Sequence, residues 1–79
     1  MAKQQHIQEL QESIKLLTRC LLQSDNDYTN IYRTVIEIIE VPILEEVMKF
    51  TGSNQSQTAQ LLGLNRATVR DRLHRHNLI

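Results

Sequence analysis

The segment from Asn54 to Arg75 constrains this chain more than any other part of its sequence. It predicts two short helices joined at Gly63, a residue that can take the positive φ needed by a sharp turn between helices. Four residues earlier, Ala59 offers only a methyl group where the two helices would cross closely. Two short helices held at a fixed angle form a helix-turn-helix, whose second helix fits the DNA major groove. We therefore expect a helix-turn-helix unit at residues 54–76.

Side chains within this segment predict where each helix begins and what holds the crossing together. Asn54 should cap a helix over residues 55–62, with Gln57 completing a capping box, and Asn65 should cap a helix over residues 66–76. The apolar side chains expected at the crossing are Leu62, Leu64, Val69 and Leu73.

The net charge of zero conceals a difference between the two ends of the chain. Residues 1–50 carry five Lys or Arg against eight Asp or Glu, whereas residues 51–79 carry four arginines against one aspartate. The basic end coincides with the predicted helix-turn-helix, so we expect it to bind a polyanion, with an ordinary solvated helix face as the alternative.

The second short helix supplies the chemistry for binding DNA. Arg66 and Arg70 are four residues apart and share a face, and Arg66 stands in the first turn, where it is the expected reader of base edges. The helix N-termini suit phosphate oxygens, and the later basic residues should hold the backbone. Asp71 should face solvent or pair with Arg75. The full set of predicted DNA contacts is Asn54, Ser56, Asn65, Arg66, Thr68, Arg70, Arg72, His74 and Arg75. Lower pH should strengthen the dependence on salt by charging His74 and His76.

The N-terminal two thirds of the chain predict two longer helices, over residues 5–23 and about 28–51. The first carries an apolar heptad stripe made of Ile7, Leu10, Ile14, Leu17 and Leu21. The second is apolar on several faces, which a chain of 79 residues is too short to cover by itself. Asp25 or Asp27 is the expected N-cap of the second helix, and Pro42 should bend it, with a break into two helices at Val41 as the alternative.

These patterns predict an all-α protein of four helices, with residues 1–79 as one domain. A chain this short buries only about 60% of its unfolded surface. Its single cysteine, Cys20, excludes an internal disulfide, and no Cys/His set has zinc-site spacing. Oligomerisation remains as the means of stabilisation, so we expect residues 5–51 to form the core of a homodimer.

Several other functions lack support in the sequence. There is no apolar run of membrane-spanning length and no signal peptide, so the chain should be soluble and intracellular. His74 and His76 diverge on a helix and do not suggest a metal site. Catalytic pairs and glycine-rich phosphate loops are absent, so we expect no enzyme activity and no cofactor.

From Tyr28 onwards the sequence resembles the Fis family of bacterial nucleoid and transcription factors. The residues that carry the resemblance are VPILEEVMKFT, the following NQ, LLGLNRATVR, and L-x-R at 73–75. The resemblance implies an intertwined homodimer of the two long helices, paired helix-turn-helix units in adjacent major grooves, and bending of duplex DNA. It also implies a role in transcription regulation or nucleoid organisation in the cytoplasm, with RNA polymerase or another transcription factor as a further partner. The chain departs from the family at Gly52, Gln57 and Asp71, where members often carry basic residues, and it also departs at His74.

Two alternatives stand beside a stand-alone Fis-like protein. Similar ends form the DNA-binding terminus of sigma-54 enhancer-binding activators, but this chain begins with Met and has no P-loop, which favours the stand-alone protein. The other alternative is a helical adaptor that binds protein and only retains the helix-turn-helix.

Overall fold

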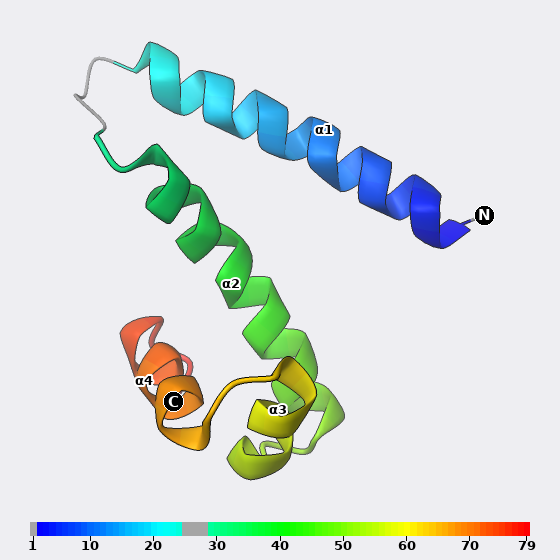
Figure 1. The fold of residues 1–79 in the computed structure, drawn as a ribbon, viewed down its shortest axis with the longest axis vertical. Coiled ribbons are helices and arrows are strands. Elements are labelled where there is room, and N and C mark those ends of the chain that lie inside the picture. The colour runs from blue at the N-terminus through cyan, green and yellow to red at the C-terminus, as the bar shows by residue number, and fades with distance from the viewer. Residues whose placement is uncertain (1, 25–28) are drawn as a thin grey trace. The chain divides into compact units, whose positions relative to one another are not determined.

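A computed structural model describes residues 2–24 and 29–79 of the chain. Its described residues form four α-helices, α1 (Ala2–Gln23), α2 (Ile31–Phe50), α3 (Gln55–Leu62) and α4 (Arg66–Arg75), and contain no strand (Figure 1). The predicted all-α class with four helices is confirmed. The chain divides into two compact units, Met1–Ile38 and Ile39–Ile79, and each is described here by itself.

In the first unit, α1 is a continuous helix with no buried residue. It begins three residues before the predicted start at residue 5. On its apolar stripe, Ile7 and Leu10 are 48% and 55% exposed, while Ile14, Leu17 and Leu21 are half-buried. A helix of this kind exposes apolar surface that its own unit does not cover.

The second long helix begins later than expected, at Ile31 instead of near Tyr28. Its first turn closes on Asn30, whose carbonyl accepts hydrogen bonds from the Thr34 N–H at 2.9 Å and the Thr34 hydroxyl at 3.0 Å. Tyr28 and the expected caps Asp25 and Asp27 lie outside the described residues.

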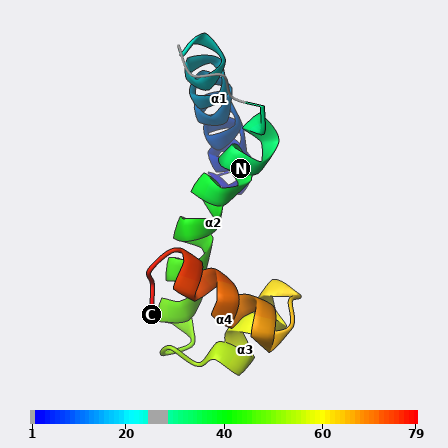
Figure 2. The same cartoon turned by 90° about the vertical axis from the view of Figure 1, so that its left-hand side faces the viewer.

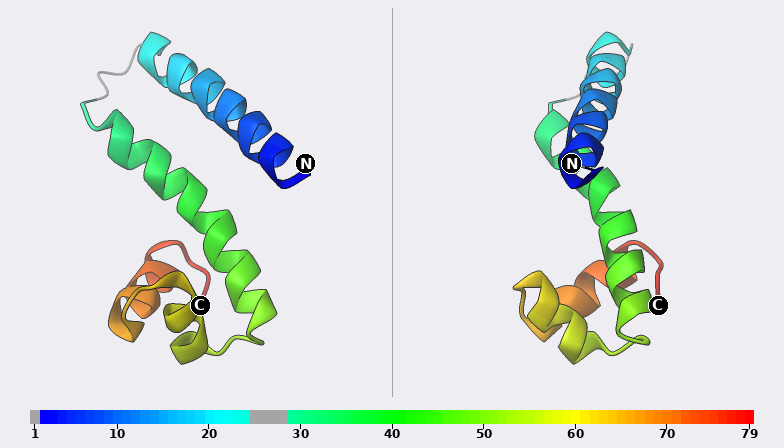
Figure 3. Two further views of the ribbon diagram at one scale, coloured as in Figure 1. Left: turned by 45° about the vertical axis from the view of Figure 1, so that its right-hand side comes forward. Right: turned by 90° about the vertical axis from the view of Figure 1, so that its right-hand side faces the viewer.

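Pro42 lies inside α2 without ending it. The helix runs as one element from Ile31 to Phe50, so the alternative of two helices divided at Val41 is wrong (Figures 2 and 3). Proline removes one backbone donor from a helix, and Pro42 stands at an exposed position of α2.

The core of the second unit lies where α2, α3 and α4 meet. Leu44, Ala59, Val69 and Leu73 are each at most 4% exposed, and they are joined by the half-buried side chains of Met48, Leu62 and Leu78. The prediction for Leu64 is wrong, because this residue is 43% exposed in the turn between the two short helices. Leu44 from α2 completes the core instead, which joins the helix-turn-helix to the end of the long helix.

Buried hydroxyl groups connect the turn before α3 to the helix itself. Thr58 is fully buried, and its hydroxyl lies 2.8 Å from that of Thr51 and 3.3 Å from the sulfur of Met48. The Thr51 hydroxyl also reaches the carbonyl of Asn54 at 3.3 Å. This network fixes the start of α3 relative to the last turn of α2.

Candidate nucleic-acid interface

The two short helices begin in the same way. Asn54 accepts a hydrogen bond through Oδ1 from the Gln57 N–H at 3.0 Å, and Asn65 accepts one from the Thr68 N–H at 2.8 Å. Both asparagines have extended backbones, as N-caps require. The two predicted caps are therefore confirmed, and each leaves the other N–H groups of a first turn available to an anion.

Gly63 forms the turn between these helices in the left-handed conformation, with φ 73° and ψ 27°. Its N–H and that of Leu64 bond to carbonyls of the last turn of α3, at Gln60 (3.3 Å) and Ala59 (3.0 Å). A Cβ built on Gly63 would meet no atom within 4 Å. The glycine is thus required by backbone conformation and not by lack of space.

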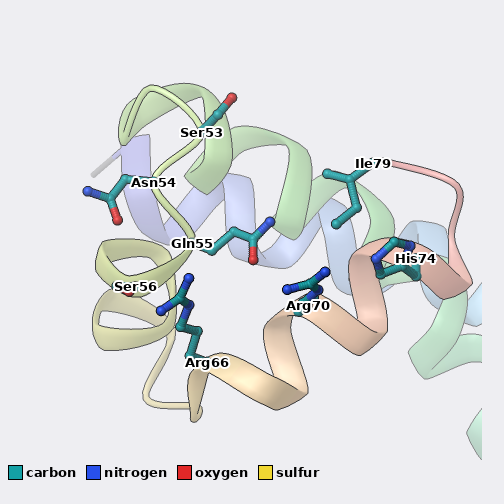
Figure 4. A pocket seen from close by; sticks show the side chains of 8 residues that line it. All are labelled: Ser53, Asn54, Gln55, Ser56, Arg66, Arg70, His74 and Ile79. Carbon is teal, nitrogen blue, oxygen red and sulfur yellow. The ribbon is translucent and has the colours of Figure 1, made fainter.

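A row of three basic side chains follows one side of α4. Arg66, Arg70 and His74 are spaced by four residues and line a single surface groove with Ser53–Ser56 and Ile79. Figure 4 shows the two guanidinium groups and the imidazole ring on the side of α4 that faces the start of α3. Cationic side chains and a helix N-terminus consequently border the same groove.

The three basic residues of the groove, which we call the groove row, are exposed, and none forms an ion pair with another described residue. Val69 and Leu73, on the opposite side of α4, are buried in the core. The helix is therefore amphipathic in the expected sense, with basic side chains along the groove and apolar side chains holding it to the unit.

The remaining basic residues of α4 lie elsewhere. Arg72 Nη1 is 3.9 Å from Glu40 Oε1 of α2, and His76 Nε2 is 2.8 Å from the same oxygen. The side chains of Arg72, Glu40 and His76 are 34%, 21% and 11% exposed. We call these three the Glu40 cluster. It joins α4 to α2 on a different side from the groove row.

Arg75 has a separate set of interactions. Its Nη2 is 3.9 Å from Asp71 Oδ2, one turn earlier on α4. This is the pair predicted from the spacing, and it holds the single acidic residue of the basic end next to a cation. Arg75 is 39% exposed, so it remains accessible to solvent.

The structure thus divides the predicted contacts into groups. Five of them line the groove: Asn54, Ser56, Arg66, Arg70 and His74. Asn65 and Thr68 form the cap of α4, while Arg72 belongs to the Glu40 cluster and Arg75 pairs with Asp71.

Some residues of the groove and of the Glu40 cluster were not predicted from the sequence. Ser53, Gln55 and Ile79 also line the groove. Ser53 and Gln55 flank a predicted cap, and that position was a usable signal. Glu40 and His76 are 36 residues apart, and nothing in a single sequence indicates that they meet.

A helix-turn-helix with a basic second helix defines the class of this protein. The sequence profile described as "Bacterial regulatory protein, Fis family" matches residues 35–76, more than half of the chain. The chain is 38% identical over 72 residues to a Fis-like DNA-binding protein of Ralstonia nicotianae, covering 80% of this chain and 94% of that one. It is 36% identical over 77 residues to DNA-binding protein Fis of Glaesserella parasuis, and the match covers 95% of this chain and 79% of that one. The chain belongs to the Fis family.

In the described ranges, 2–24 and 29–79, no helix combines the length and apolarity that crossing a membrane demands.

Proposed function

We propose that this protein is a dimeric, Fis-like DNA-binding protein that binds and bends duplex DNA in transcription regulation or nucleoid organisation. The observation that carries the proposal is the groove row on α4, opposite the N-terminus of α3. The names of the relatives, which describe DNA-binding proteins, agree with it. The nucleoid is the location that follows from this function.

Within the site, Arg66 is the proposed reader of base edges. It stands at the first residue of α4 and borders the groove, and arginine can donate to guanine O6 and N7 together. Arg70 and the N-termini of α3 and α4 would hold phosphates on either side of it. Arg75 and Arg72 would add backbone contacts, with the charge of Arg72 partly balanced by Glu40.

The dimer rests on the apolar surface of the first unit. No residue of α1 is buried, and Ile7, Leu10, Leu16 and Leu22 are each about half exposed or more. Exposed apolar stripes on helices mark surfaces for other helices. A second copy of the chain would cover this surface and would supply a second helix-turn-helix, so that one duplex meets two units.

The proposal is tested by titrating a labelled DNA duplex with the protein at several salt concentrations. Two or three phosphate contacts from each subunit predict a slope of log K against log salt of roughly −4 to −5. Arg70→Ala should make that slope shallower by about 2 units in a dimer, at roughly 0.9 per contact. Arg19→Ala, which removes an exposed arginine of α1, is the matched control and should leave the slope unchanged.

A slope near zero would contradict the proposal, because the basic end would then not meet phosphate. In that case binding to protein, as in the adaptor alternative, would become the better account of the exposed apolar surface. DNA bending is measured separately, by energy transfer between dyes at the two ends of the bound duplex.

A further inference from the structure

The two histidines near the end of α4 lie in opposite surroundings although they are only two residues apart. His76 is 11% exposed and bonds through Nε2 to Glu40 at 2.8 Å. His74 is exposed and lines the groove with Arg66 and Arg70. The sequence predicted that both histidines would act on DNA. In the structure only His74 belongs to the proposed interface.

The imidazole of His74 forms no hydrogen bond or ion pair with another described residue. It continues the spacing of the two arginines by one further turn, so it occupies the position of a third cation in the groove row. Unlike arginine, an imidazole changes its charge between about pH 5 and 8. The groove row thus contains two fixed positive charges and one that depends on pH.

Several charged groups lie near His74. On α4 these are Arg66 and Arg70 along the groove, with Asp71 and Arg75 paired to each other beside it. The groove residues before α3, Ser53–Ser56, are uncharged.

Two further groups come from other elements. A neighbouring hollow, which shares Ser53 and Ile79 with the groove, is lined by Glu45 and Lys49 of α2.

We propose that His74 is a proton-controlled phosphate contact, so that this protein takes up protons as it binds DNA. The inference rests on the proposed function of the groove. A phosphate within about 4–6 Å favours imidazolium over imidazole. This contact should therefore strengthen DNA binding fully at low pH, where the imidazole is charged. It should be lost at high pH, where the imidazole is neutral. If bound DNA makes the charged form of the imidazole tenfold more favourable, the affinity at low pH rises by up to about tenfold per subunit.

The experiment measures DNA affinity between about pH 5 and 8 at fixed ionic strength, using one labelled duplex and the full chain. The wild-type protein should bind more tightly as the pH falls. His74→Gln should remove most of that dependence, and His74→Lys should hold affinity near its acid-side value at every pH. The matched controls are His76→Gln and His6→Gln, which alter the other two histidines of the chain and should preserve the dependence.

A second measurement detects the proton directly. Calorimetric titration of the same duplex in two buffers with different ionisation enthalpies reports the number of protons taken up. That number should be positive for the wild type and should fall toward zero in His74→Gln. Because His74 is exposed, its variants should keep the wild-type circular dichroism and melting temperature, which excludes loss of fold as the cause.

The outcomes separate this inference from the proposed function. Tight, salt-dependent DNA binding that does not change with pH, or a pH dependence that survives in His74→Gln, would overturn the role of His74 and leave DNA binding intact. A pH dependence lost only in His76→Gln would assign the effect to the Glu40 cluster instead. Absence of DNA binding at every pH and at low salt would refute the function of the groove itself.

Discussion

At the scale of single residues, the side chains of α4 differ in role because the helix has three different surroundings. Val69 and Leu73 are in the core, Arg72 and His76 meet Glu40, and the groove row faces outward. Spacing by four residues is what places the members of the groove row on one side. Their separate contributions can therefore be measured one residue at a time.

Arg66→Ala should weaken binding to a preferred DNA site by about 1–3 kcal/mol and reduce discrimination among bases, because it removes the proposed bidentate contact to guanine. The measurement is competition binding against a panel of duplexes that differ at single positions. Arg75→Ala is the comparison and should weaken binding to all sequences alike. If Arg66→Ala also scales every sequence equally, Arg66 contacts the backbone and is not the reader.

Thr58→Val should lower the free energy of unfolding by about 1–2 kcal/mol. The change keeps the volume of the fully buried side chain but removes its hydroxyl, which pairs with that of Thr51 at 2.8 Å. Denaturant unfolding followed by circular dichroism gives the value. Thr29→Val, at an exposed position, is the control and should change stability little. Equal effects at both positions would mean that the buried pair contributes nothing.

At the scale of elements, the turn between α3 and α4 depends on one backbone conformation. Gly63→Ala should destabilise the protein by about 1–2 kcal/mol, the energy of placing a residue with a Cβ in the left-handed region. Because a Cβ there meets no atom within 4 Å, no steric term should add to this. Gly63→Asn should have a smaller effect, since asparagine tolerates that conformation. Thermal or denaturant unfolding of both variants tests the order, and equal losses would point to a clash instead.

The N-terminus of α3 has a structural role and a proposed binding role, and one substitution should separate them. Asn54 caps the helix through Oδ1 and also borders the groove. Asn54→Asp should preserve stability, because a carboxylate accepts the same hydrogen bond, but should weaken DNA binding by repelling phosphate. Asn54→Ala should instead lower stability by about 1 kcal/mol. Unchanged DNA affinity in Asn54→Asp would place the phosphates away from α3.

At the scale of the whole molecule, stability should depend on association between chains. The unfolding midpoint should rise with protein concentration, because the proposed dimer couples folding to association. Leu10→Glu should lower that midpoint and shift the sedimentation mass toward the monomer, because it places a charge on the apolar stripe of α1. Gln8→Glu adds the same charge at another exposed position of α1 and should have little effect. A monomeric mass with a midpoint independent of concentration would contradict the dimer.

Local features of the sequence were sufficient for much of this structure. Both short helices begin after the predicted asparagine caps, Gly63 has the predicted positive φ, and α3 has its predicted bounds. These features depend on residues that lie within a few positions of one another, where hydrogen-bond and steric preferences are strong. The spacing of Arg66 and Arg70 predicted a shared face for the same reason, and the groove that they line agrees with it.

Tertiary packing decided the rest, because it depends on contacts between residues far apart in the chain. Leu64 is exposed although it lies within the helix-turn-helix segment, whereas Leu44, which precedes that segment, takes a place in the core. His74 and His76 look equivalent in the sequence, and only the position of Glu40 on α2 distinguishes them. The sequence by itself determined which helices form and which of them is basic, while packing against α2 determined which side of α4 is exposed along the groove.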